Sequence, residues 1–232
     1  MKAMILSDML TAKKYLVQQL VVALLVGGFV CIVMENLYVV APMLAVLIPF
    51  SLAFTIIALD ERGDWQQFRL ALPLSRADIV VGRYLSLGLL ALIGMVTGLV
   101  LTGLVIAAAQ LLPSVPQLAN LMTNFSWQAV LFSSVIGLAV ILFMLAITMP
   151  LVSRFGMTKA VRYLPLIVVI GVMLLLTGLK DFEAPAFLLD FIAWVATPAG
   201  TVAVAAGTLI IMLVLYALSA TVAVKLYAKR EL

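Results

Sequence analysis

Six long apolar runs, separated by short stretches that hold nearly all the charges, constrain this chain more than any other feature. The runs cover about 15–34, 37–59, 84–109, 126–149, 163–179 and 201–224. Runs of this length cross the roughly 30 Å hydrocarbon core of a bilayer as helices. They are continuous, whereas the strands of a transmembrane barrel alternate over about ten residues. We therefore predict an all-α, polytopic membrane protein with six transmembrane helices in a single domain, 1–232.

The basic residues indicate how these spans are oriented. Of the 14 Lys and Arg residues, all but Lys180 fall in segments on the side of the two termini. The positive-inside rule places that side, and therefore both termini, in the cytoplasm. The net charge of +4 is accounted for by this topology, so we expect no nucleic acid partner.

Missing residue types exclude several classes of chemistry. The chain has no His and one Cys, Cys31, which removes the usual general base, the commonest metal ligand and any disulfide within the chain. It also lacks a G-x-x-x-x-G-K-[ST] phosphate loop. No predicted span carries an ionisable residue in its interior, although ion-coupled transporters generally need one. We expect no catalytic site, metal or cofactor here, so any ATP must be bound by another chain.

Small residues and prolines give the spans their local features. Gly94, Gly98 and Thr102 are four apart in the third span, a spacing that lets helix backbones approach closely, and contact inside the bundle is favoured over a subunit interface.

The prolines Pro42 and Pro49 should kink the second span and free carbonyls near Ser51 and Thr55. These four residues are candidates for a transport pathway, although prolines are also common in ordinary transmembrane helices.

The stretch 60–83, between the second and third spans, is the most informative loop. Its middle is predicted to form a short amphipathic helix that begins at Asp64 as N-cap and ends before Pro73. Trp65, Phe68 and Leu72 form one apolar stripe of this helix. The stripe could enter a groove on a partner chain or lie on lipid headgroups, and the residues alone favour neither.

A second helix is predicted to follow at once. Ser75 serves as its N-cap, Asp78 stands at the N3 position, and the helix continues through Arg83 into the third span. The candidate contacts for a partner are therefore Asp60, Glu61, Asp64, Trp65, Phe68, Arg69, Leu72, Ser75 and Arg76.

The run LPLSRADIVVGRYLS, from Leu72 to Ser86, resembles a stretch found in ATP-binding-cassette (ABC) type 2 permeases, in particular small six-span bacterial ones. The resemblance implies a multi-pass protein of the bacterial plasma membrane. It further implies a homodimer that pairs with separate ATPase subunits, on which ATP and Mg are bound. In this family the loop after the second span docks on the ATPase, which favours the coupling interpretation of 60–83.

The resemblance also implies an interfacial helix at the N terminus, over 1–14. The residues support it independently, because apolar and polar side chains separate on its two sides. Ile5, Leu6, Met9, Leu10, Ala12 and Leu16 lie on the apolar side, and Ser7, Asp8, Thr11 and Lys14 on the other.

The segment 180–200 holds an apolar stretch too short to span a membrane, so it should re-enter or lie in the interface. In the family, short outer helices before the last span act as a gate, for which Phe187, Phe191 and Trp194 are the candidates. An aromatic belt at the outer surface explains the same residues equally well.

Together these features indicate the permease subunit of an exporter. The apolar, uncharged spans suit an amphipathic or hydrophobic substrate, and the resemblance makes a peptide the first candidate, ahead of a lipid or drug. The alternative is a membrane scaffold, sensor or immunity subunit without transport of its own, and a channel comes third.

Overall fold

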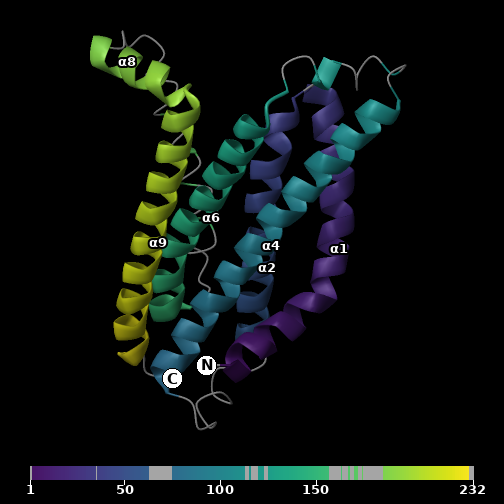
Figure 1. The fold of residues 1–232 in the computed structure, drawn as a ribbon. Coiled ribbons are helices and arrows are strands. Elements are labelled where there is room, and N and C mark those ends of the chain that lie inside the picture. The colour runs from purple at the N-terminus through teal and green to yellow at the C-terminus, as the bar shows by residue number, and fades with distance from the viewer. Residues whose placement is uncertain are drawn as a thin grey trace.

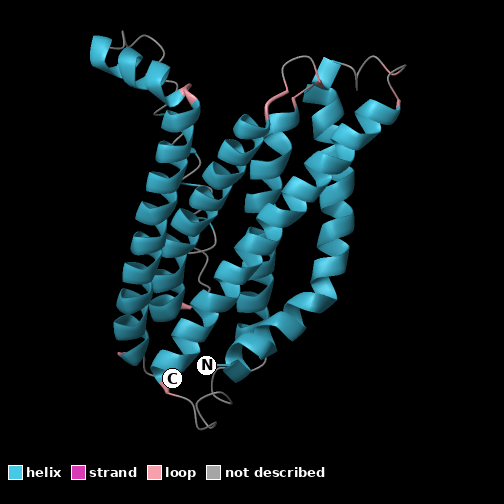
Figure 2. Ribbon diagram, viewed as in Figure 1, coloured by secondary structure: helices cyan, strands magenta, loops and turns pink. Residues whose placement is uncertain are grey.

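The computed structural model describes residues 2–34, 36–62, 75–112, 115, 120–122, 125–156, 163, 167, 170, 171, 174 and 185–229. These residues are mostly helical, with no strand among them (Figure 2). The helices are α1 (Lys2–Met34), the 3-10 turn η1 (Leu37–Val39), α2 (Val40–Arg62), α4 (Arg76–Leu111), α6 (Trp127–Phe155), α8 (Ala186–Val195) and α9 (Pro198–Ala228). The predicted all-α class is confirmed for this part of the chain.

Within the described ranges, five helices are long and apolar enough to cross a membrane. They cover Met4–Cys31, Leu37–Asp60, Arg76–Leu111, Trp127–Phe155 and Pro198–Ala228. The remaining predicted span, 163–179, lies mostly outside the described residues, so the count of six stays a prediction. The N terminus and the end of α9 lie at the same end of the bundle (Figure 1). We call this end, with the starts of α1 and α4 and the last turns of α2 and α9, the terminal end.

Helix α2 lies at the centre of the bundle, where it packs against α1, α4 and α6. Leu44, Ile48, Leu52 and Ile56 are fully buried and follow one another at intervals of four residues. They form a continuous face of the helix. Because lipid tails are as apolar as these side chains, close van der Waals packing holds such a helix in place.

Small residues bring the backbones of α2 and α4 into contact. A Cβ atom added at Gly98 would lie 2.7 Å from the carbonyl oxygen of Ala41, and one at Gly94 would lie 2.8 Å from Cδ of Pro49. Thr102 is buried, and its hydroxyl donates to the carbonyl oxygen of Gly98 at 2.9 Å. The predicted contact of these small residues inside the bundle is thereby confirmed.

The two prolines of α2 differ in their effect on the helix. Pro49 lies inside α2, but Pro42 lies in its first turn, where a backbone N–H has no partner within the helix. Pro42 packs on α6, because a Cβ at Gly137 would lie 2.5 Å from its Cα. The kink predicted at Pro42 is therefore wrong. This proline lies in the first turn of α2 and packs against α6.

Helix α8 leaves the bundle at the opposite end and makes a sharp corner with α9 (Figure 1). Thr197 holds the corner: its hydroxyl donates to the carbonyl oxygen of Trp194 at 2.6 Å and accepts from the N–H of Gly200 at 3.1 Å. A side chain at Gly200 would collide with that same carbonyl. Glycine is thus required at this corner by close approach, which fixes the direction of α8.

Candidate functional site at the terminal end

The first turn of α4 begins at the end of the loop that the sequence assigns to coupling. The hydroxyl oxygen of Ser75 accepts from the N–H of Asp78 at 3.0 Å and donates to Oδ2 of Asp78 at 2.6 Å. Ser75 is thus the N-cap, with Asp78 three residues later, as the sequence predicts. An N-cap of this kind satisfies an otherwise unpaired N–H and defines where the helix begins.

Arg76 joins the start of α4 to the end of α9. Its Nη1 donates to the carbonyl oxygen of Ala228 at 2.8 Å. The last carbonyls of a helix lack partners within it and carry partial negative charge, so a guanidinium there is favourable on both counts. The side chain predicted to face a partner ATPase therefore also holds two helix ends together.

A buried ionic cluster lies two turns further along α4. The guanidinium of Arg83 stands between two carboxylates: Nη1 lies 3.3 Å from Oδ1 of Asp8, and Nη2 donates to Oδ2 of Asp60. Ser86 completes the cluster, because its hydroxyl donates to Oδ2 of Asp8 at 2.6 Å. The side chains of Arg83, Asp8 and Asp60 are only 7%, 1% and 13% exposed.

This cluster connects three helices at the terminal end. Asp8 belongs to α1, Asp60 to the last turn of α2, and Arg83 to α4. Removing one member of a buried ion pair leaves an uncompensated charge, at a cost of about 3–5 kcal/mol. Both ends of the loop between α2 and α4 are consequently held to each other and to α1.

The burial of Asp8 corrects the interpretation of the N-terminal segment. The sequence places Asp8 on a polar side, away from the apolar residues, but Met4, Asp8 and Ala12 are all buried and lie four residues apart. They face the bundle, whereas Leu6 and Leu10 are exposed. A polar residue such as Asp8 is ordinarily predicted to contact water, but this aspartate is instead paired with Arg83 inside the protein.

Helix α1 is continuous from Lys2 to Met34, and its first turns run at an angle to the rest (Figure 1). An interfacial location for 1–14 stays a prediction.

The ionic cluster also refines the expected absence of charge from the spans. Asp8, Asp60 and Arg83 all fall within helices of membrane-crossing composition, because those helices extend beyond the predicted boundaries. Asp60 ends its span, and the other two lie in the first two turns of theirs. The charges are therefore at the ends of the spans, not in their middles.

The remaining candidates of the loop fall beyond the part of the chain that the structure describes. Asp64, Trp65, Phe68, Arg69 and Leu72 lie outside the described residues. Glu61 belongs to the last turn of α2, but its side chain is outside the described part as well. Their contact with a partner stays a prediction.

The pathway candidates are engaged within the bundle. Pro49 packs on Gly94 of α4. The hydroxyl of Ser51 donates to the carbonyl oxygen of Ile48 at 3.2 Å, and that of Thr55 to the carbonyl oxygen of Ser51 at 2.8 Å. Both hydroxyls are satisfied within their own helix, as is common for Ser and Thr in apolar surroundings. A role in a pathway stays a prediction for Pro42 and these three.

The gate candidates all lie on α8. Phe187, Phe191 and Trp194 are exposed, and the rings of Phe191 and Trp194 are 5.9 Å apart between centroids. The described part of α8 packs mainly against the start of α9. Both a gate and an aromatic belt stay predictions for these three residues.

No group of three or more His, Cys, Asp or Glu side chains comes together as metal ligands within the described ranges. In those ranges the groups of the terminal end can pair charges and cap helices, and they connect α1, α2, α4 and α9.

Long apolar helices, with buried charges gathered at one end, define a polytopic helical membrane protein. The family description "ABC-2 family transporter protein" matches residues 3–228. The chain therefore belongs to the ABC-2 transporter family, as the resemblance of Leu72–Ser86 indicates. It is a multi-pass membrane protein, of the plasma membrane in bacteria, and the family implies pairing with an ABC ATPase subunit. No curated protein and no solved structure gives a match.

Proposed function

We propose that this chain is the permease subunit of an ABC exporter, which moves an amphipathic or hydrophobic substrate out of the cell. ATP and Mg are bound and ATP is hydrolysed on a separate ATPase chain. The observation that carries the proposal is the match to the transporter family over residues 3–228. An amphipathic peptide is the first candidate substrate, and lipids and drugs of similar character follow.

The terminal end faces the cytoplasm in this proposal. The basic residues in the loops and tails on that side support the orientation through the positive-inside rule. The ATPase chain then meets the loop between α2 and α4, whose two ends are the last turn of α2 and the Ser75 cap of α4.

The ionic cluster gives the loop a mechanical connection to the bundle. Because Arg83 pairs with both Asp60 and Asp8, a displacement of the loop ends moves α1, α2 and α4 together. Closure of the ATPase dimer can then shift the spans between inward and outward states, provided that each state is favoured by a different nucleotide condition.

Two copies of the chain form the transporter in this proposal. Support comes from the apolar side chains that α9 exposes along its length, including Ile210, Val214 and Leu218. Such surfaces face lipid or another helix in a membrane. Phe187, Phe191 and Trp194 would line the outer gate of the dimer.

The coupling step can be tested with a paired set of variants. The double variant Trp65→Ala, Phe68→Ala should lose co-purification with the partner ATPase chain. It should also lose ATP-driven uptake of a fluorescent amphipathic peptide into inside-out vesicles. Trp127→Ala is the control, because Trp127 is an exposed tryptophan at the opposite end of the bundle.

The outcomes separate transport from its alternative. Undiminished association of the double variant would refute docking through the amphipathic stripe. A complex whose ATPase activity ignores every amphipathic peptide tested, and whose vesicles take up none, would instead be a scaffold, sensor or immunity subunit.

A further inference from the structure

An apolar furrow runs between α4 and α9 on the terminal half of the bundle. One part has a volume of about 720 Å³ and is lined by residues that include Val81, Tyr84 and Lys225. A second part, of about 510 Å³, continues from it past Gly88. Tyr84, Leu85, Leu213 and Tyr216 line both parts, so we treat them as one α4–α9 furrow. Each volume falls within the range of about 300–1,000 Å³ that is usual for ligand pockets.

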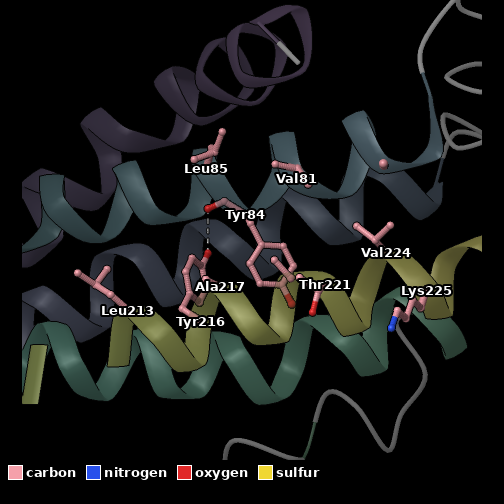
Figure 3. A pocket seen from close by; sticks show the side chains of 11 residues that line it. Val81, Tyr84, Leu85, Leu213, Tyr216, Ala217, Thr221, Val224 and Lys225 are labelled. Atoms are coloured by element: carbon pink, nitrogen blue, oxygen red, sulfur yellow. Dashed lines mark hydrogen bonds between the residues drawn. The ribbon is translucent and has the colours of Figure 1, made fainter. Parts of the chain in front are cut away.

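The hydroxyls of the tyrosines that line the furrow are already hydrogen-bonded within the protein. The hydroxyl of Tyr216 donates to the carbonyl oxygen of Tyr84 at 2.8 Å, which Figure 3 shows as a dashed line. The hydroxyl of Tyr84 pairs with that of Ser219 at 2.8 Å, and Ser219 donates to the carbonyl oxygen of Ala146. With these hydroxyls turned inward and satisfied, the two rings present carbon to the furrow. The surroundings suit a hydrocarbon chain.

One end of the furrow is basic. Lys225 lines it there (Figure 3), and Lys229 follows one turn later on the same side of α9. Arg76 lies at the same corner, with its guanidinium on the carbonyl oxygen of Ala228. No carboxylate among the described residues pairs with Lys225. The nearby Asp78 is engaged by Ser75. Among the residues that the structure describes, the three basic side chains at this mouth outnumber the one carboxylate.

The dimensions of the furrow match one leaflet of a membrane. Lys225 and Leu213 are twelve residues apart on α9, which corresponds to about 18 Å of helix at 1.5 Å per residue. Half of the hydrocarbon core is about 15 Å thick. An acyl chain that starts beside Lys225 would thus reach Leu213 at about the middle of the bilayer.

We propose that the α4–α9 furrow binds an anionic phospholipid, with its phosphate beside Lys225 and an acyl chain against Tyr84 and Tyr216. The basic mouth fits the phosphate of such a molecule. The apolar floor and the length of the furrow fit its acyl chain. A zwitterionic lipid satisfies the floor but gains less from the basic mouth. The furrow is lined mainly by α4 and α9 and holds no member of the ionic cluster, and the inference does not depend on the proposed transport function, although Arg76 at the mouth is also a predicted ATPase contact.

Two glycines of α4 provide a matched test of the acyl portion of the site. A Cβ at Gly88 would meet only Tyr216, at 3.9 Å, whereas a Cβ at Gly103 would meet nothing within 4 Å. Both positions accept a side chain without a collision, but only Gly88 lines the furrow. Gly88→Leu should therefore fill the furrow, and Gly103→Leu should leave it open.

The measurement is native mass spectrometry of the full-length chain, delipidated in detergent and titrated with dioleoyl phosphatidylglycerol or dioleoyl phosphatidylcholine. The chain should retain phosphatidylglycerol preferentially. Gly88→Leu should abolish that retention, and Gly103→Leu should preserve it. Lys225→Gln should weaken phosphatidylglycerol binding about fivefold, since one lysine near a membrane surface contributes about 1 kcal/mol. Lys14→Gln, which removes an exposed charge from α1, should leave the binding unchanged.

Three results would overturn the proposal. Equal retention of phosphatidylglycerol by Gly88→Leu and Gly103→Leu would place the lipid elsewhere. Equal binding of the two lipids, unaffected by Lys225→Gln, would remove the anionic headgroup from the assignment. Efficient disulfide crosslinking of two copies through Val81→Cys, in a Cys31→Ala background, would show that a second copy occupies the furrow instead.

Discussion

The two sides of α4 are packed in opposite ways. Toward α1 and α2, Gly94 and Gly98 let backbones touch, and Arg83 is buried between two carboxylates. Toward α9, the rings of Tyr84 and Tyr216 meet at 4.9 Å between centroids and border an open furrow. Arg83 and Tyr84 are neighbours in the sequence, yet each belongs to a different one of these contacts.

This difference separates a fixed contact from an adaptable one. Over half of the α2 span is buried inside the structure, at 56%, against 6% for α9. A closely packed contact allows few other arrangements, because even a small change in side-chain volume disturbs it. An open, apolar contact can admit lipid or let one helix shift against another. We therefore expect α1, α2 and α4 to behave as one body, and α9, which packs mainly on α6, to be able to shift against α4.

The largest expected effect comes from breaking the ionic cluster. Arg83→Met removes the shared cation and leaves Asp8 and Asp60 buried without it. The free energy of unfolding should fall by about 3–5 kcal/mol, as for other buried pairs that lose one partner. Chemical denaturation of the purified chain in mixed micelles measures this change.

A triple variant shows whether the loss comes from charge. Asp8→Leu, Asp60→Leu, Arg83→Met removes all three ionic groups, and such replacements are often neutral in other proteins. The triple variant should recover most of the stability that the single variant loses. If the single variant is as stable as the original chain, then Arg83 does not hold the three helices together.

The contact of Gly98 with α2 gives the next largest expected change in stability. Gly98→Ala places a Cβ 2.7 Å from the carbonyl oxygen of Ala41, so α2 and α4 must separate, at a cost of about 1–3 kcal/mol. Gly103→Ala, on the same helix but in open space, should instead stabilise by about 0.5–1 kcal/mol because alanine favours helix more than glycine does. The same denaturation assay compares them, and equal effects would show that the close approach is not limiting.

The sequence predicts the local parts of this site but not its long-range pairs. The cap at Ser75 depends on a residue three positions away, so its pattern is readable from a short window. The pairing of Asp60 with Arg83 crosses 23 residues, and that of Asp8 with Ser86 crosses 78. Nothing within a single helix marks such partners, and polar residues beside an apolar run are ordinarily assigned to water.

The spacing of the apolar residues in α1 itself indicates that Asp8 is buried. Asp8 lies midway between Met4 and Ala12, on a face that is otherwise buried. A single acid on such a face calls for a basic partner from another helix. Hydropathy likewise ends a span at its first charge, so Arg83 falls outside the predicted third span, although the helix predicted from the Ser75 cap already runs through it.

The smallest expected effect tests the other side of α4. Tyr84→Phe removes a hydroxyl that pairs with Ser219, which still donates to Ala146. The loss should be about 1 kcal/mol, the usual net contribution of one hydrogen bond. The ring remains as a spacer, so binding of phosphatidylglycerol should not change. If binding falls together with stability, then the hydroxyl takes part in holding the lipid, and the furrow is less purely apolar than its satisfied tyrosines indicate.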